Sequence, residues 1–332
     1  MERFTVRNGD VHLGVLADGP ADSAEPPILC VHGWPELAWS WRHQIAHFAA
    51  RGRRIAALDV RGYGESSKPT EIAAYTMAQL TGDVAAVIDA LGGCAILFGH
   101  DWGAPIVWQT AVRHADKVAA VAGLSVPYTP MGDVSFIPLM RQLYAGKFFY
   151  QLYFQEPGVA EAEFAGDPDA LAKIYYGISG EGMRAGALRE KGPQDRFLTG
   201  MPMPDPLPAW LPAEDLEVYN QAFARGGWTG PLNRYRAQEI DFEERAPAVG
   251  KHVTQPAAFI AGTLDPVRRF IPGHDAYADA GRACDDFRGI TLIEGAGHWV
   301  QQEAPGEVNA ALERFVGGLQ LPSLEEGGLR KV

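Results

Sequence analysis

Six short apolar runs, each bounded by turn residues, constrain the fold of this chain more than any other feature. They read "PPILCVHG", "RRIAALDV", "CAILFGHD", "VAAVAGLSVP", "PAAFIAGTLD" and "ITLIEGAGH". Apolar runs without polar alternation are typical of strands that are covered on both faces, as in a mostly parallel sheet. Parallel strands need crossover connections, which usually hold helices. The runs therefore predict an α/β fold.

The segments around these runs complete the predicted layout. "RFTVRNGDVHLGVLADG" alternates apolar and polar residues around Asn8-Gly9, which predicts an antiparallel hairpin at the start of the sheet. "TMAQLTGDVAAVIDALGG" has apolar residues at helical spacing, begins with a capping box formed by Thr76 and Gln79, and ends in two glycines. Alternation of strands and helices predicts a doubly wound sheet.

Residues 131–244 interrupt the strand pattern. Aromatic, helical segments such as "LMRQLYAGKFFYQLYFQ" and "AEDLEVYNQAFARG" flank a proline-rich stretch there. Strand-like runs resume near Pro256. We therefore expect an α/β core at residues 1–130 and 245–332, with a helical cap at residues 131–244 inserted over one edge of the sheet.

Composition limits the classes of partner. The 332 residues are 47% hydrophobic and 21% charged, as in ordinary globular proteins. A net charge of -12 without a Lys/Arg cluster argues against nucleic acid. Because the chain has neither an export signal nor a run of about 20 apolar residues, we expect a cytoplasmic protein that binds no membrane.

Three widely spaced cysteines match neither a disulfide framework nor a zinc site, and we expect no metal or cofactor. The oligomeric state stays open, a homodimer included.

Four features with chemical potential follow predicted strands, where open α/β sheets bind their ligands. The first is the loop "VHGWPE", and the others are three single residues later in the chain: Asp101, Asp265 and His298. Asp101 is the middle residue of Gly-x-Asp-x-Gly, in "ILFGHDWGAP", where many hydrolases have serine. The order nucleophile, acid, histidine is that of the α/β-hydrolase triad.

An aspartate nucleophile suits a two-step reaction. A carboxylate is ionised at neutral pH, so it needs no base to attack an sp³ carbon. The resulting alkyl ester is released only when water attacks its carbonyl, and His298 can activate that water. Asp265 would orient the imidazole and stabilise its charge. Alone, Asp101 could instead cap a helix and Asp265 could initiate a turn before proline.

The "VHGWPE" loop and the residue after Asp101 are the expected oxyanion and substrate contacts. Backbone N–H groups of Trp34 and Trp102 could stabilise the oxyanion of the ester intermediate, and their side chains could form walls of the pocket. We expect His32 to shape this loop, together with Gly33 and Pro35, and His100 to be structural.

These motifs resemble the epoxide hydrolases of the α/β-hydrolase fold, with a single hydrolase domain. The similarity runs from "HGWPELAWSWRHQI" through "DVRGYGESSKP" and "GHDWGAP" to "GHWVQQEAP". Within the cap, "YQLYFQEPGVAEAEF" and "GPLNRYR" look like the segments that carry that family's two tyrosines. The resemblance implies that Tyr150 and Tyr235 protonate the epoxide oxygen, with Tyr153 as the competitor of Tyr150. Arg234 stands where an aromatic residue is common in relatives.

The predicted activity is hydrolysis of a small apolar epoxide by water to a vicinal diol. A haloalkane dehalogenase is the nearest alternative, since it would share Asp101, His298 and the ester. However, a halide leaves without a proton, so the two tyrosines of the cap would have no role as proton donors. A non-catalytic receptor of the same fold is the remote alternative, because every triad position is filled. The identity of the epoxide cannot be deduced from the sequence.

Overall fold

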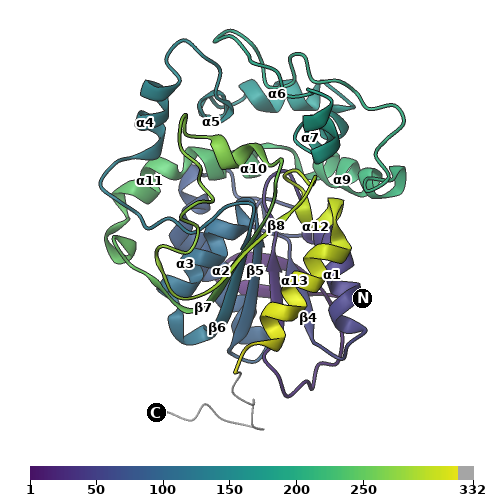
Figure 1. The fold of residues 1–332 in the computed structure, drawn as a ribbon, viewed down its shortest axis with the longest axis vertical. Helices are drawn as coiled ribbons and strands as arrows, with labels where there is room; N and C mark the ends of the chain where they lie inside the picture. Colours follow the sequence, from purple (N-terminus) through teal and green to yellow (C-terminus); the bar gives the residue numbers. More distant parts are fainter. Residues whose placement is uncertain (321–332) are drawn as a thin grey trace.

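A computed structural model of the chain describes residues 1–320, so residues 321–332 of the predicted core lie outside the described residues. One eight-stranded sheet forms its centre, in the order β1-β2-β4-β3-β5-β6-β7-β8 (Figure 1). β2 runs antiparallel to its neighbours β1 and β4, and the other neighbouring strands are parallel. The strands are β1 Glu2–Asn8, β2 Val11–Asp18, β3 Ile28–Val31, β4 Ile55–Leu58, β5 Ala95–His100, β6 Val118–Leu124, β7 Val253–Gly262 and β8 Cys284–Ile293.

Helices cover both faces of the sheet, as the continuous apolar runs predict. Leu29 and Val31 of β3 pack on one face in a core that includes apolar residues of α2 and α3. Ile28 and Cys30, the alternate residues, pack on the other face in a core that includes α1 and α13. Successive side chains of a strand point to opposite faces, so both sets are buried. The four helices are α1 Arg42–Ala49, α2 Met77–Ala90, α3 Gly103–Arg113 and α13 Pro305–Gly317.

The predicted hairpin and capped helix are both present. Asn8 pairs with Val11 across the first turn, where Gly9 takes a φ of 58°. The Thr76 side chain accepts a hydrogen bond from the backbone N–H of Gln79, which caps α2. The mostly parallel, doubly wound α/β fold predicted from the sequence is therefore confirmed.

The last strand differs from its expectation. The apolar run "ITLIEGAGH" predicts a strand covered on both faces, whereas β8 begins at Cys284 and lies at the edge of the sheet. Its outward residues are exposed, including Ile290 at 42% and Leu292 at 38%. An apolar run does not show which strand ends a sheet, because that depends on pairing with distant segments.

Between β6 and β7 the chain forms only helices, which lie together beyond the upper end of the sheet in Figure 1. "AEDLEVYNQAFARG" forms one helix, α9, as its spacing predicts. "LMRQLYAGKFFYQLYFQ" instead forms parts of two helices, separated by a segment in which Gly146 has a φ of 76°. The helices are α4 Phe136–Leu143, α5 Tyr150–Tyr153, α6 Val159–Ala165, α7 Ala170–Gly177, α8 Gly180–Arg184, α9 Ala213–Gly226, α10 Thr229–Arg236 and α11 Gln238–Glu243.

Short elements complete the chain between these helices and strands. They are the 3₁₀ turns η1 Ala38–Trp41, η2 Ile72–Tyr75, η3 Ala115–Lys117, η4 Ala246–Ala248 and η5 Pro266–Arg269, and the helix α12 Val300–Glu303. No helix in the described part of the chain is long and apolar enough to span a membrane.

Candidate active site

Asp101 lies in the tight turn between β5 and α3. Its φ of 49° is unusual for a residue with a side chain, and it projects the carboxylate away from the strand. Gly99 and Gly103, two residues before and after Asp101, let the backbone of this turn pack closely against its neighbours. A Cβ on Gly99 would lie 2.3 Å from the carbonyl oxygen of Gly103, and one on Gly103 would lie 2.0 Å from that of Val31. The sequence pattern around Asp101 is therefore a packing requirement of the turn.

The loop after β3 supplies a hydrogen-bond donor to this carboxylate. The backbone N–H of Trp34 donates to Asp101 Oδ1 at 2.7 Å. Gly33 allows the loop to approach, since a Cβ there would lie 2.3 Å from Asp101 Oδ1. Trp102, the other predicted donor, makes no backbone hydrogen bond to Asp101 within residues 1–320. Pro35 lies one residue farther from Asp101, and its carbonyl oxygen accepts a hydrogen bond from Tyr175.

His298 lies between two carboxylates. Its Nε2 is 3.3 Å from Asp101 Oδ2, and its Nδ1 is 3.1 Å from both oxygens of Asp265. Burial by itself lowers the pKa of His298, but the two carboxylates outweigh burial and raise this pKa well above 6.5. Burial likewise raises the pKa of Asp265, but His298 outweighs it and the pKa is lowered. His298 thus contacts both of the other predicted triad residues, and Asp265 also caps η5 through the backbone N–H of Val267.

Two tyrosines of the helical segment reach the same site. Tyr150 begins α5 and Tyr235 lies in α10, and their ring centroids are 5.9 Å apart. Burial, followed by the charge of Asp101, raises the pKa of Tyr150 well above 10. Burial also raises the pKa of Tyr235. Both phenols therefore keep their protons at neutral pH.

Tyr150 and Tyr153 differ in their partners. The Tyr150 hydroxyl accepts a hydrogen bond from Gln151 Nε2 at 2.9 Å, which leaves its O–H group free to donate. Tyr153 donates to Glu163 Oε2 at 2.8 Å and does not line the cavity above Asp101. The geometry therefore favours Tyr150 over Tyr153 as the tyrosine of this site.

A cavity of about 510 Å³ lies between Asp101 and His298 and the helices that connect β6 to β7. Asp101 and His298 lie on its sheet side, and Tyr150 and Tyr235 line it from the helices. Most of the remaining lining is apolar or aromatic, including Trp34, Phe149, Ile178, Phe197, Met201, Val267 and Phe270. This volume suits a small apolar molecule. No cluster of three His, Cys, Asp or Glu side chains in residues 1–320 is placed to hold a metal ion.

A buried carboxylate that the sequence analysis did not single out, Glu36, supports the loop after β3. Glu36 Oε2 accepts a hydrogen bond from the Gly33 N–H at 3.1 Å and pairs with His100 Nδ1 at 2.6 Å. His100 Nε2 in turn donates to the backbone carbonyl of His298 at 2.7 Å. His32 donates from Nδ1 to the Gly33 carbonyl at 2.8 Å. Both histidines therefore contact the backbone of the site, as expected for structural residues.

A second missed carboxylate holds the loop that carries His298. Glu303 accepts hydrogen bonds from the backbone N–H groups of Gly180, Gly297 and Trp299 at 2.7, 3.0 and 3.0 Å. Burial raises its pKa. The single acidic residue within "GHWVQQEAP", close to His298, is the sequence signal that could have indicated this role.

Comparisons with known proteins agree with this arrangement. The family model for the alpha/beta hydrolase fold matches residues 26–162. Epoxide hydrolase A of Mycobacterium tuberculosis is 44% identical over 326 residues, which covers 96% of this chain and 98% of the relative. The chain belongs to the epoxide hydrolase family.

Solved epoxide hydrolases share the whole fold. The crystal structure of epoxide hydrolase A from Mycobacterium thermoresistibile superposes with a TM-score of 0.87 at 41% identity, covering 97% of this chain and 99% of the other. Potato epoxide hydrolase I superposes with a TM-score of 0.84 at 32% identity, covering 95% and 99%. The predicted family is thus confirmed, and the protein is a hydrolase.

Proposed function

We propose that this epoxide hydrolase converts small apolar epoxides and water into vicinal diols through an ester on Asp101. The observation that carries the proposal is the placement of two protonated phenols, Tyr150 and Tyr235, in the same cavity as the Asp101 carboxylate and His298. Opening an epoxide creates an alkoxide, which needs a proton that a phenol can supply.

In the first step, Asp101 Oδ2 attacks a ring carbon while Oδ1 stays bound to the Trp34 N–H. The carbon–oxygen bond of the ring breaks, and the oxygen takes a proton from Tyr150 or Tyr235. The products are a hydroxyalkyl ester of Asp101 and a phenolate, which regains its proton from solvent. The contact between Trp34 and Oδ1 supports this assignment, because it directs Oδ2 to the substrate.

In the second step, His298 removes a proton from water, which attacks the carboxyl carbon of Asp101. The oxyanion that forms lies where the Trp34 N–H already donates, and one such donor is typically worth about 3–4 kcal/mol. The ester bond then breaks, and the His298 imidazolium protonates the departing oxygen. Esterification removes the charge of Asp101, which lowers the pKa of His298 and favours the neutral imidazole that can accept a proton from water.

Haloalkane dehalogenation is the second candidate. It would use the same Asp101 and His298, and one observation favours it: the buried indole N–H of Trp34 has no hydrogen-bond partner within residues 1–320, and Trp34 lines the cavity. An unpaired indole N–H could hold a halide. The two candidates differ in what they require of the tyrosines.

Diol formation from styrene oxide tests the proposal, with Tyr150→Phe and Tyr153→Phe as matched variants. Each removes one hydroxyl from the same helix, but only Tyr150 lines the cavity. We expect kcat to fall about 100-fold in Tyr150→Phe and to stay close to wild type in Tyr153→Phe. Equal effects in both variants, or halide release from 1-chlorohexane without diol formation, would contradict the proposal. Ligand that binds but stays intact would indicate a receptor.

A further inference from the structure

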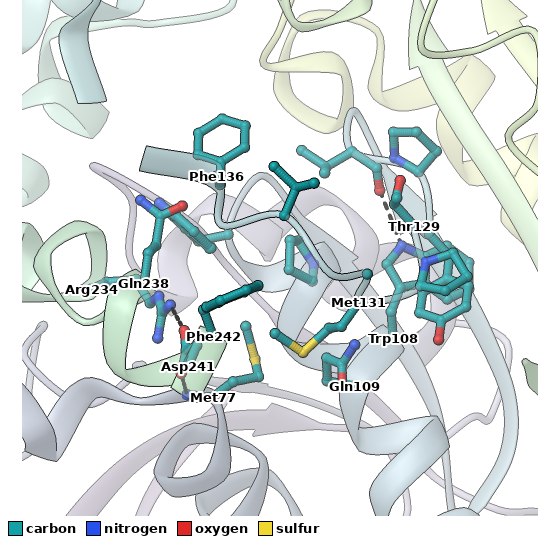
Figure 2. Close-up of a pocket in the computed structure, with 18 residues that line it drawn as sticks. Met77, Trp108, Gln109, Thr129, Met131, Phe136, Arg234, Gln238, Asp241 and Phe242 are labelled. Atoms are coloured by element: carbon teal, nitrogen blue, oxygen red, sulfur yellow. Dashed lines mark hydrogen bonds and ion pairs between the residues drawn. The ribbon is translucent and has the colours of Figure 1, made fainter. Parts of the chain in front are cut away.

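A second cavity lies on the other side of Trp102 from the catalytic residues. Its volume is about 300 Å³, and it shares no lining residue with the cavity above Asp101. Figure 2 shows its walls, with Arg234, Gln238 and Asp241 on one side and Trp108 and Thr129 on the other. The lining comes from α3, from the segment between β6 and α4, and from α10 and α11.

Two polar atoms of the residues that line this cavity are buried without a hydrogen-bond partner within residues 1–320: Oε1 of Gln109 in α3 and Nε of Arg234. Gln109 is only 6% exposed, and its carboxamide oxygen is the unpaired acceptor of the two. By contrast, the indole N–H of Trp108 donates to the Val126 carbonyl at 3.0 Å, and Gln238 donates to Gln151 at 3.0 Å. Buried amides are normally paired, so an unpaired carboxamide oxygen among apolar walls is an open hydrogen-bonding position.

Trp102 and Arg234 form the wall between the two cavities. The Arg234 guanidinium lies 4.7 Å from the ring centroid of Trp102. It also pairs with the carboxylate of Asp241, a residue that is itself buried. The contact with the Trp102 ring and the ion pair with Asp241 hold the guanidinium in place. Trp102 and Arg234 therefore separate the second cavity from the cavity above Asp101. The ring centroids of Trp102 and Tyr235, a residue that lines the cavity above Asp101, are 5.3 Å apart.

We propose that the second cavity is a separate binding site for a small, mostly apolar molecule that carries one amide or hydroxyl group. The apolar lining accounts for most of the ligand, and an N–H or O–H donor of its amide or hydroxyl group would pair with Gln109 Oε1. A cavity of 300 Å³ equals the liquid volume of about ten waters, which suits a ligand of roughly ten non-hydrogen atoms. Val134, one of the lining residues, is 68% exposed, so the cavity reaches the surface there.

Benzamide is a suitable probe, since it has an aromatic ring, one carboxamide and no ring that the enzyme could open. Its binding is measured by titration calorimetry with 1-phenyl-1,2-ethanediol present in excess. The diol occupies the active site, a step that rests on the proposed function. We expect benzamide to bind with a stoichiometry of one under these conditions. Gln109→Leu should weaken binding roughly five- to tenfold, the loss of one buried hydrogen bond.

Two further variants make the result decisive. Thr129→Trp changes an exposed residue at the edge of the cavity and should also weaken binding, so the test survives if Gln109→Leu misfolds. Gln79→Leu removes an exposed glutamine of α2 and should leave binding unchanged. The outcomes that would overturn the proposal are distinct. If the diol displaces benzamide, or if the Gln109→Leu and Thr129→Trp variants bind benzamide as tightly as wild type does, the cavity is not a separate site.

If no benzamide binds at all, the proposed ligand class is wrong. If the diol itself does not bind, the proposed function is in doubt, while the comparison of variants still decides the second site.

Discussion

Gly33 is the residue at which the oxyanion geometry can be tested most simply. A Cβ at this position would lie 2.3 Å from Asp101 Oδ1 and 2.6 Å from the Trp102 nitrogen. We expect Gly33→Ala to move the loop and remove the Trp34 donor, which should lower kcat about 10²- to 10³-fold in a styrene oxide assay. Gly82→Ala is the control, because a Cβ there meets only Asn8 Nδ2 at 3.7 Å. It should keep full activity, and a full-activity Gly33→Ala would refute the predicted role.

The pKa of His298 should depend on the charge of Asp101. Burial lowers this pKa, whereas Asp265 and then Asp101 raise it, and the net result lies well above 6.5. Asp101→Asn removes one of the two charges, as the ester would, so we expect a lower pKa for His298 in that variant. An NMR titration of the histidine signals, assigned with His298→Gln, measures the difference. An unchanged pKa would mean that esterification does not prepare His298 as a base.

The same shift predicts how stability depends on pH. The pKa of His298 is higher in the folded protein than in the unfolded chain, so its pairing stabilises the fold fully below a pH of about 6.5. That contribution is lost as the pH rises through the folded-state pKa. The Tm difference between wild type and His298→Gln should therefore shrink as the pH is raised above 6.5. A difference that grows with pH would contradict the predicted sign.

Individual residues were predictable from sequence where the strand pattern placed them. Asp101, Asp265 and His298 each follow an apolar run, and the carboxyl ends of parallel strands meet at one edge of a sheet. The role of Glu36 could not be predicted. Its partners, His100, Gln301 and Gln302, lie far along the chain, and residue spacing holds no information about such contacts.

At the scale of helices, the buried pair of Arg234 and Asp241 joins α10 to α11. The side chains are 4% and 8% exposed, and Asp241 also accepts a hydrogen bond from the Met77 N–H at 2.6 Å, at the start of α2. Arg234→Met would leave the buried Asp241 carboxylate without its ion-pair partner. We expect a loss of about 3–5 kcal/mol in the free energy of unfolding, measured in urea. The double variant with Asp241→Leu should recover part of that loss. Purely additive losses would show that the pair is not coupled.

The elements of the sheet layer were easier to predict than the helices between β6 and β7. The strands are short apolar runs between turns, and α2 and its N-terminal cap follow from local spacing. Between β6 and β7, the aromatic segment from residue 139 to 155 has helical composition throughout, yet the helix is interrupted near Gly146. Tyr150 is the first residue of α5, and its ring contacts those of Phe149 and Phe270; local spacing does not reveal the contact with Phe270, which is 120 positions away.

At the scale of the whole molecule, the proposed reaction needs both layers. The sheet supplies Asp101, Asp265 and His298, and the helices between β6 and β7 supply Tyr150 and Tyr235. The fold class and a helical layer over one edge of the sheet could be predicted from the order of apolar runs, but the two tyrosines that line the cavity could be identified only by resemblance to a family. Contacts between segments more than 100 residues apart create that cavity, and no local pattern encodes them.

The most direct test of the account is a single turnover of styrene oxide, with enzyme in excess, in water enriched in ¹⁸O. If Asp101 forms the ester, the first oxygen added to the substrate comes from its carboxylate. The diol of this first turnover should therefore contain no ¹⁸O, and mass spectrometry of the Asp101 peptide should show one ¹⁸O gained. A first-turnover diol that carries ¹⁸O, with an unlabelled Asp101 peptide, would mean that water attacks the epoxide directly and would contradict the account.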